Sequence, residues 1–492
     1  MTGRWSFAAV LALLGATTAA PLDLRAQRPA RPRPKVAAPA PDTTKKAPVA
    51  AAKDTARFTD TLSFDRPQYP SAYRRRPNPP VLIRNATVMT AAGQELTGAS
   101  ILFQDGRITT VGANLEAPAG AQVVDGTGKF VTPGIIDTHS HLGVYSAPGT
   151  QAESDGNEAT NPVTAEVWAE HSIWPQDPQI PLAIAGGVTV AQILPGSANL
   201  IGGRSAIIRM IPARTVQELK YPDAPYGMKM ACGENPKRVY QQRGPSTRMG
   251  NMAGDRAAFI LAEQYRLKWD KWQRDRKGDP PARDLRLETL ADVLRGKIFV
   301  QNHCYRADEM AQMLDLAKEF GFTIRSFHHG VEAYKIADLL ATAGTAASVW
   351  ADWGGFKMEA FDEITENLAL LQQAGVRTIL HTDDPNGIQR MNQDAAKSMY
   401  AGIRAGINVT RDQALRWITA NPAWVLGIDR ATGTLEPGKT ADVVLWSGDP
   451  FSVYSKTEKV WNDGWLVFDR NDPKHHYWTD FNLGQAAPGV GR

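Results

Sequence analysis

The sequence predicts an α/β fold, a distorted (β/α)8 barrel inserted in a small β-sandwich that is built from both ends of the chain. Three observations carry this prediction. Short β-rich runs open and close the ordered part of the chain, helices that end in glycine alternate with buried strands between them, and histidines follow the ends of those strands. A closed barrel is favoured over an open sheet, because no glycine-rich dinucleotide-binding motif follows any strand.

The composition is that of a globular enzyme. Of 492 residues, 43% are hydrophobic and 22% are charged, which excludes a disordered, collagen-like or coiled-coil chain. The formal net charge of +4 comes from 55 Lys and Arg against 51 Asp and Glu. This charge is too close to balance to indicate a nucleic-acid partner. Two cysteines exclude a disulfide-rich scaffold or a zinc ribbon.

Residues 1–26 have the order of a secretory signal peptide, with Arg4 before an apolar run from Trp5 to Ala16. A buried N-terminal helix is the alternative. Residues 27–75 form a Pro/Ala/Lys-rich linker that we expect to be disordered, because it has few large apolar residues to offset the entropy of ordering. No later segment reaches the roughly 18 apolar residues of a membrane helix. We therefore expect a periplasmic or secreted enzyme without a stable membrane span.

Two groups of β-rich runs predict the sandwich, at residues 76–132 and 432–470. The first group reads VLIRNATVMT, ASILFQDGRITTVG and AQVVDGTGKFVTPG, and the second contains ADVVLW and WLVF. Neither group has enough apolar faces to be stable alone, so we expect both to pair in one sheet system. Residues 471–492 are then a C-terminal tail.

Residues 133–431 contain the predicted barrel. Gly321, Gly344 and Gly375 each end a helical stretch, and a buried strand follows each glycine at once, in FTIRSFHH, TAASVW and VRTILHT. A barrel carries its chemistry at the carboxyl ends of its strands, so functional residues are expected there.

Histidines and acids stand at four of these strand ends. They are His139 and His141 in PGIIDTHSH, His303 in IFVQNH, His328 and His329 in TIRSFHH, and Asp383 and Asp384 in TILHTDD. Alternation along a strand puts His139 and His141 on one face, which suits two ligands of one metal. Donors from separate strand ends of one barrel can converge, so the pattern predicts a metal site with nitrogen and oxygen ligands.

These motifs, together with NPAWVLGI and GTLEPGKTADVVLWSGDP, resemble the metal-dependent amidohydrolase superfamily, and within it the imidazolonepropionase-like and prolidase-like members. The resemblance runs from about Val81 to Phe468. It implies a distorted TIM barrel carrying a β-sandwich, with one or two divalent metal ions, taken as zinc, that activate a water. It also implies a hydrolase of amide, dipeptide or cyclic-amide bonds in a small-molecule substrate.

The resemblance assigns the ligands by position. The metal ligands are His139 and His141 from strand 1, His303 and His329 from strands 5 and 6, and Asp383 from strand 8. His329 is preferred over His328 because the family places its histidine directly before glycine. His328 is then either a group behind the ligands or a packed core residue.

Asp383 is also the expected catalytic residue, taking a proton from the water and delivering it to the leaving nitrogen. His381 and Asp384 are the alternative bases. A deaminase of the superfamily typically carries Glu three residues after the strand 5 histidine, where this chain has Arg306. Amide hydrolysis is therefore preferred, with deamination of an amino-heterocycle and a non-catalytic barrel as the alternatives.

The ligand from strand 4 has two candidates. Lys229 in YGMKMACGEN resembles the carboxylated lysine that bridges two metals in prolidase-like relatives. Its methionine neighbours indicate a buried strand, where a lone ammonium is costly. Glu234 is the alternative, because other members use a glutamate, but it lies five residues on and outside the strand. If neither residue binds, the enzyme holds one metal.

The stretch 235–297 departs from a minimal barrel. Its cationic residues near the metal strand are Lys237, Arg238, Arg243 and Arg248. They form either a wall that recognises a substrate carboxylate or part of a solvated helical insertion. Trp350 and Trp353, after strand 7, either line the pocket or pack in the core. A homo-oligomer is compatible with the sequence.

Cys232 and Cys304 follow strands 4 and 5, which are neighbours at one rim of a barrel. Adjacent strands lie about 4.7–4.9 Å apart, close to the Cα separation that a disulfide requires. Against a disulfide, Cys304 follows His303 and should point to the opposite face of its strand. The sequence leaves open a disulfide and a pair of buried thiols.

Overall fold

A computed structural model describes residues 69–475 of the chain. The predicted signal peptide lies outside the described residues, as do most of the predicted linker and tail. The described end of the linker contacts both the barrel and the sheet of the chain ends, since Ala72 N donates to Gln217 O at 2.8 Å and Tyr73 Oη donates to Asp463 Oδ2 at 2.8 Å. Between residues 69 and 475, no helix combines the length and apolar character that crossing a membrane requires.

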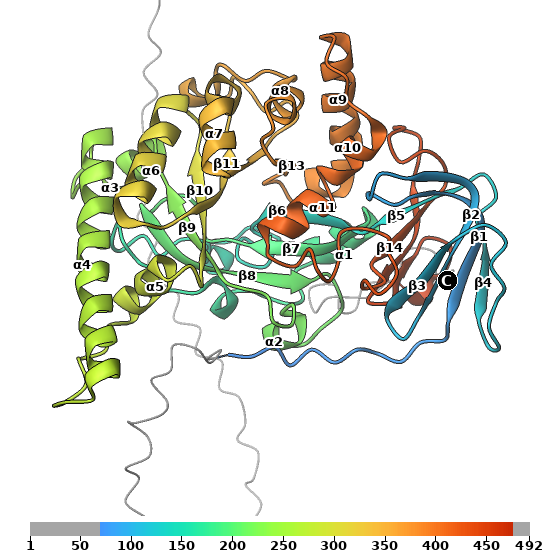
Figure 1. The fold of residues 1–492 in the computed structure, drawn as a ribbon, viewed down its shortest axis with the longest axis horizontal. Coiled ribbons are helices and arrows are strands. Elements are labelled where there is room, and N and C mark those ends of the chain that lie inside the picture. Colours follow the sequence, from blue (N-terminus) through green and yellow to red (C-terminus); the bar gives the residue numbers. More distant parts are fainter. Residues whose placement is uncertain (1–68, 476–492) are drawn as a thin grey trace, which may run out of the picture. The chain divides into compact units, whose positions relative to one another are not determined.

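One eight-stranded sheet joins both ends of the described chain (Figure 1). Its order is β16-β15-β14-β5-β1-β2-β3, with β4 beside β1. The two chain ends meet in the antiparallel pair of β5 and β14, where Val131 lies opposite Leu445. The strands are β1 (Val81–Met89), β2 (Glu95–Gln104), β3 (Arg107–Gly112), β4 (Gln122–Asp125), β5 (Phe130–Pro133), β14 (Val443–Trp446), β15 (Thr457–Asn462) and β16 (Trp465–Asp469).

This sheet folds over an apolar core. Phe103 of β2 packs edge-on against Trp461 of β15, with ring centroids 5.6 Å apart, although the two strands are far apart in the order of the sheet. Both rings are fully buried, together with Ile83 and Ile101. The β-sandwich built from both chain ends is therefore confirmed.

A second sheet forms the barrel, with its eight strands in sequence order. They are β6 (Ile135–Ser140), β7 (Val188–Ile193), β8 (Ile201–Arg209), β9 (Gly227–Ala231), β10 (Phe299–Cys304), β11 (Ile324–His329), β12 (Ala346–Val349) and β13 (Thr378–Leu380). β8 runs antiparallel to both of its neighbours. Only residues 194–200 join β7 to β8, which is too short for the crossover that a parallel neighbour needs.

The barrel is nearly closed by a segment that belongs to neither edge strand. In the described sheet β13 and β6 are not neighbours, and the backbone at Trp417 and Ile418 lies between them. Leu380 N donates to Trp417 O at 3.0 Å, and Ile136 N donates to Ile418 O at 2.9 Å. The predicted distorted barrel is confirmed, and this gap and the reversed β8 are its distortions.

Helices follow the strands as the glycine signals predict. They are α1 (Gln179–Ala185), α2 (Val216–Leu219), α3 (Glu234–Tyr240), α4 (Arg248–Asp275), α5 (Leu285–Leu294), α6 (Ala307–Phe320), α7 (Ala337–Ala343), α8 (Asn367–Gln373), α9 (Met391–Arg404), α10 (Arg411–Arg416) and α11 (Ala420–Val425). Gly321 and Gly344 end α6 and α7 with φ of 72° and 64°. Only glycine adopts this left-handed conformation without steric cost.

Cys232 and Cys304 form a disulfide, with their Cα atoms 5.3 Å apart. β9 and β10 are parallel neighbours, and Cys232 N donates to His303 O at 2.9 Å just beyond the end of β9. Because Cys232 lies past the strand, its side chain is free of the strand's alternation and turns towards Cys304. The disulfide closes a loop of 72 residues that contains α3, α4 and α5.

We predict that replacing both cysteines by serine lowers the free energy of unfolding by about 4 kcal/mol, the chain-entropy value for a loop of this length. Urea unfolding of the variant and of the oxidised enzyme measures the difference. Reduction of the wild-type protein should give the same shift, which separates loss of the crosslink from the effect of the serines. Coincident unfolding midpoints would show that the crosslink does not stabilise the fold.

Candidate metal centre

The five predicted ligands meet at the carboxyl ends of the barrel strands. Asp383 Oδ1 lies 3.2 Å from His141 Nε2 and 3.5 Å from His139 Nε2, and Asp383 Oδ2 lies 4.0 Å from His329 Nδ1. The rings of His303 and His329 have centroids 4.5 Å apart. β6, β10, β11 and the loop after β13 therefore bring all five to one point.

Two of these residues have backbones in the left-handed region. The φ angle is 72° at His329 and 56° at Asp383, a conformation that costs a residue with a side chain about 1–3 kcal/mol. His329 N donates to His381 Nε2 at 3.2 Å, which holds the turn of the chain at the end of β11. The surrounding structure thus fixes a backbone that aims both side chains at the centre.

A chain of hydrogen bonds sets the tautomer of His139. Gln301 Oε1 lies 2.8 Å from His328 Nε2, so His328 donates there and accepts at its Nδ1. His328 Nδ1 is in turn 2.9 Å from His139 Nδ1, which must therefore donate. His139 keeps its Nε2 lone pair, and that atom faces Asp383. His328 thus lies behind His139, a position that fits the first of the two roles that the sequence left open.

The donor set fits a divalent cation. His141 Nδ1 donates to Leu194 O at 2.8 Å, so the Nε2 lone pair of His141 faces a carboxylate oxygen of Asp383. Two acceptors at 3.2 Å need a positive charge between them, which is either a proton or a bound metal ion. His303 Nδ1 and His329 Nδ1 are buried without a hydrogen-bond partner. Imidazole nitrogens and carboxylate oxygens are the ligands that zinc takes in hydrolytic sites.

Burial keeps these donors in the forms that bind a metal. Burial, and then the nearby Lys229, hold the pKa of His139 and of His303 well below the usual range, so both rings are neutral. At Asp383, burial raises the pKa, but while no metal is bound a proton on the facing His141 nitrogen, through its hydrogen bond and charge, outweighs burial and lowers the pKa. The centre therefore offers lone pairs on neutral rings beside one carboxylate.

Lys229 is the strand 4 residue at the centre. It is fully buried on β9, and its Nζ lies 3.2 Å from His139 Nε2. Burial lowers its pKa to about 8. Glu234, the alternative, begins α3 beyond the strand and pairs with Lys357 at 3.3 Å. The structure thus brings Lys229, and not Glu234, to the other donors.

Two further residues of the centre carry no assigned ligand role in the sequence interpretation. Asp137 is fully buried and accepts hydrogen bonds from His139 N at 3.0 Å and from Thr382 Oγ1 at 3.4 Å. It therefore joins β6 to the loop after β13. Burial raises its pKa to about 7. The alternation that pairs His139 with His141 also puts Asp137 on their face, which is the signal that could have found it. His381 offers a nitrogen within 4.8 Å of donors of His139 and His329.

The predicted cationic wall is largely committed to other partners. Arg243 donates to the carbonyls of Ala159 and Thr160, and Arg248 pairs with Glu309 at 3.0 Å and with Glu359. These two guanidinium groups therefore fasten the insertion to the barrel, which favours the structural alternative for this segment.

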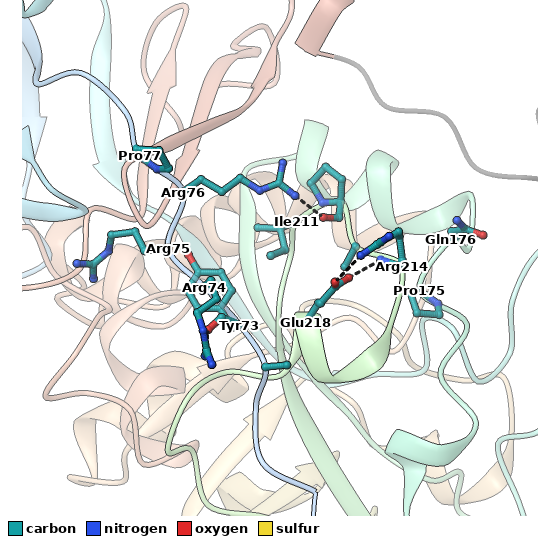
Figure 2. A pocket seen from close by; sticks show the side chains of 13 residues that line it. Tyr73, Arg74, Arg75, Arg76, Pro77, Pro175, Gln176, Ile211, Arg214 and Glu218 are labelled. Carbon is teal, nitrogen blue, oxygen red and sulfur yellow. Dashed lines mark hydrogen bonds and ion pairs between the residues drawn. The ribbon is translucent and has the colours of Figure 1, made fainter. Parts of the chain in front are cut away.

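A cavity of about 590 Å³ lies away from the histidine cluster, lined by Arg74, Arg75, Arg76 and Arg214 (Figure 2). Three of these arginines already have partners. Arg75 pairs with Asp463 at 2.9 Å, Arg76 donates to Pro212 O at 3.3 Å, and Arg214 pairs with Glu218 at 3.4 Å. Figure 2 shows Arg75 pointing away from Arg76, so the arginines do not converge on one point.

The fold and the donor set together define a class, that of barrel enzymes whose strand ends hold a catalytic metal. Known proteins agree with it. A family model described as the amidohydrolase family matches residues 335–468. The crystal structure of an amidohydrolase from Thermotoga maritima MSB8 is 40% identical, covers 79% of this chain and 100% of its own, and has a TM-score of 0.74.

Two curated relatives extend the comparison. The amidohydrolase TasK of Hapsidospora irregularis is 34% identical over 455 residues, which are 82% of this chain and 46% of the relative. The chain thus spans about half the length of that protein. An imidazolonepropionase of Mesorhizobium japonicum is 23% identical over 388 residues, which are 70% of this chain and 86% of the relative. This chain belongs to the amidohydrolase family, a class of hydrolases that act on carbon–nitrogen bonds.

We predict that His328→Phe weakens metal binding about 10- to 100-fold, because it removes the acceptor that fixes the tautomer of His139. Chelator competition with metal analysis measures the affinity. His171→Phe is the control, since the His171 ring is half exposed and packs on Tyr69 and Trp168. An affinity that stays at the wild-type value in His328→Phe would assign His328 to core packing.

Proposed function

We propose that this protein is a zinc-dependent hydrolase of amide, dipeptide or cyclic-amide bonds in small molecules. The observation that carries the proposal is the convergence of His139, His141 and Asp383, whose donor atoms all lie within 4.8 Å of one another. Membership of the amidohydrolase family supports the reaction class.

Five side chains would hold the metal, with Lys229 as a sixth where two ions bind. They are His139, His141, His303, His329 and Asp383. A bound divalent ion supplies positive charge that lowers the pKa of a water and polarises the scissile carbonyl. Neutral imidazoles leave that charge largely uncompensated, which is why histidine-rich sites suit this chemistry.

Asp383 would move the proton. Its side chain is 23% exposed, whereas the His139 and His329 side chains are 1% exposed, so its carboxylate is accessible to a substrate. It would accept a proton from the attacking water and pass it to the leaving nitrogen. The carbonyl carbon gains a hydroxyl group and the nitrogen gains a hydrogen as the C–N bond breaks. Asp384 is less suited, because its carboxylate accepts from Gly387 N.

The position that distinguishes deaminases favours amide hydrolysis. Arg306 lies three residues after His303 and pairs with Asp308 at 2.9 Å, with 42% of its side chain exposed. A guanidinium held outward at this position cannot act as the acid that deamination requires.

We predict that Asp383→Asn lowers kcat at least ~10²-fold, the usual cost of losing a general base, while most of the metal stays bound. Steady-state kinetics on N-acyl amino acids, dipeptides and lactams, with metal analysis of the same samples, measures both effects. The neighbouring Asp384→Asn is the matched control and should retain most of the activity. If Asp384→Asn or a His381 variant loses the activity instead, the base is that residue.

We also propose that Lys229 is carboxylated, which rests on its resemblance to the bridging lysine and on its position beside His139. Its amine would add to carbon dioxide and release a proton, giving a carbamate with two oxygens for two metals. The carbamate would replace a buried cation by an anion beside cationic metal ions, which removes an electrostatic penalty.

We predict a carbamate signal by ¹³C NMR when wild-type enzyme is loaded with metal in ¹³C-labelled bicarbonate, and none in Lys229→Met. The variant should also bind fewer metal ions per chain. Lys220→Arg is the control, because Lys220 pairs with Glu170 at 2.6 Å and is not among the donors of the centre. If the wild type and Lys229→Met bind the same number of metal ions and neither gives a carbamate signal, Lys229 is not carboxylated and the site holds one metal without it.

The protein is further proposed to be periplasmic or secreted. The Cys232–Cys304 disulfide supports an oxidising compartment, because cytosolic thiols are kept reduced. Cell fractionation of a bacterial host that expresses the full chain should find the processed protein outside the cytoplasm. Unprocessed protein with free thiols in the cytosol would contradict this location.

A further inference from the structure

A pocket of about 460 Å³ adjoins the metal centre, and Asp383 forms part of its wall. Four aromatic side chains make up most of the remaining wall, Tyr305, Trp350, Trp353 and Phe356, which we call the aromatic pocket. A molecule seated there therefore touches the residue that would move the proton.

The inner rings of the aromatic pocket are fixed. Trp350 is buried, its Nε1 donates to Thr382 O at 3.1 Å, and its ring centroid lies 4.4 Å from that of His329. Tyr305 is also buried, and its ring stacks on His329 at 5.2 Å. Trp350 and Tyr305 thus form an apolar floor beside the histidine cluster. Because both rings are already in place, this floor requires no change of their side-chain conformations.

The outer rings of the aromatic pocket are exposed to water. Trp353 is 42% exposed and Phe356 is 58% exposed, yet their ring centroids lie only 5.5 and 5.8 Å from that of Trp350. Large apolar side chains held in the open beside a site are typical of a surface that a ligand covers. Removing their exposed area from water stabilises a complex by about 25 cal/mol per Å².

The charges around the aromatic pocket favour a neutral apolar occupant over a cation. Asp352 in its wall pairs with Lys397 at 3.0 Å. Asp383, the other acid of the wall, faces the histidine cluster. Lys357 lies 4.0 Å from the centroid of the Tyr305 ring and pairs with Glu234. The acids of the wall thus already have cationic or metal-binding partners.

We propose that the aromatic pocket binds an aromatic or bulky aliphatic group of the substrate, next to the scissile carbon–nitrogen bond. This inference rests on the proposed function, since it takes Asp383 as the reacting end of the pocket. It makes the preferred substrates N-acyl amino acids or dipeptides with a large apolar side chain, and it assigns Trp353 and Phe356 to substrate specificity.

The kinetic test uses metal-loaded enzyme and dipeptides that differ in one side chain, phenylalanine, leucine, alanine or lysine. We expect kcat/KM to be at least ~10-fold higher for phenylalanine and leucine than for alanine, because each methylene in an apolar pocket is worth about 10-fold or more. Trp353→Ala and Phe356→Ala should narrow that ratio. Phe361→Ala is the matched control, a 69% exposed ring nearby that does not line the pocket, and should keep the wild-type ratio.

A binding measurement separates failure of this inference from failure of the proposed function. Tryptophan fluorescence reports binding of N-acetyl-phenylalanine amide and N-acetyl-alanine amide to Asp383→Asn protein, with and without Phe356→Ala. One outcome is that the phenyl ligand binds more tightly than the alanine ligand, that Phe356→Ala abolishes this difference, and that the wild type hydrolyses no amide. This outcome supports the substrate role of the aromatic pocket and overturns the proposed hydrolysis. Turnover that is equal for alanine, lysine and phenylalanine substrates supports the reaction and overturns the pocket.

Discussion

Burial of neutral imidazoles is the constraint on which the rest of this structure depends. Away from water, rings such as His139 and His329 stay unprotonated and keep lone pairs. Hydrogen bonds that His328 donates to Gln301 Oε1 and His141 donates to the Leu194 carbonyl then decide which ring nitrogen of His139 and of His141 faces the centre. The barrel strands, the left-handed turns at their ends and these partners all serve to aim lone pairs at one small volume.

The sequence predicts the barrel, the sandwich and the five donors because the carboxyl ends of parallel strands share one rim. Histidines at those strand ends can therefore be assigned to one site without knowing which residues contact each other across the fold. The role of Asp137 in joining two strand ends cannot be predicted in this way, since its second partner, Thr382, lies 245 residues away in the chain. The same holds for Arg248, whose acidic partners come from other elements. The reversed direction of β8 depends on the length of a loop and not on the residues of the strand itself.

Three successive residues at the end of β10 have three different tasks. His303 points to the metal centre, Cys304 forms the disulfide to Cys232, and Tyr305 forms part of the aromatic pocket. Alternation along a strand separates neighbouring side chains in this way. One short segment thus couples the proposed ligand set, the covalent crosslink and the aromatic pocket, so a shift of this strand end disturbs all three together.

The carbonyls of Trp417 and Ile418, which bridge β13 and β6, come later in the chain than every proposed donor. During synthesis all five donors leave the ribosome before this segment does. A nascent chain that ends before residue 417 therefore carries the complete set of side chains without a fixed rim to order them. Selective binding of a metal then requires the finished chain. If the protein is exported, as proposed above, the compartment in which folding ends decides which metal ions are available.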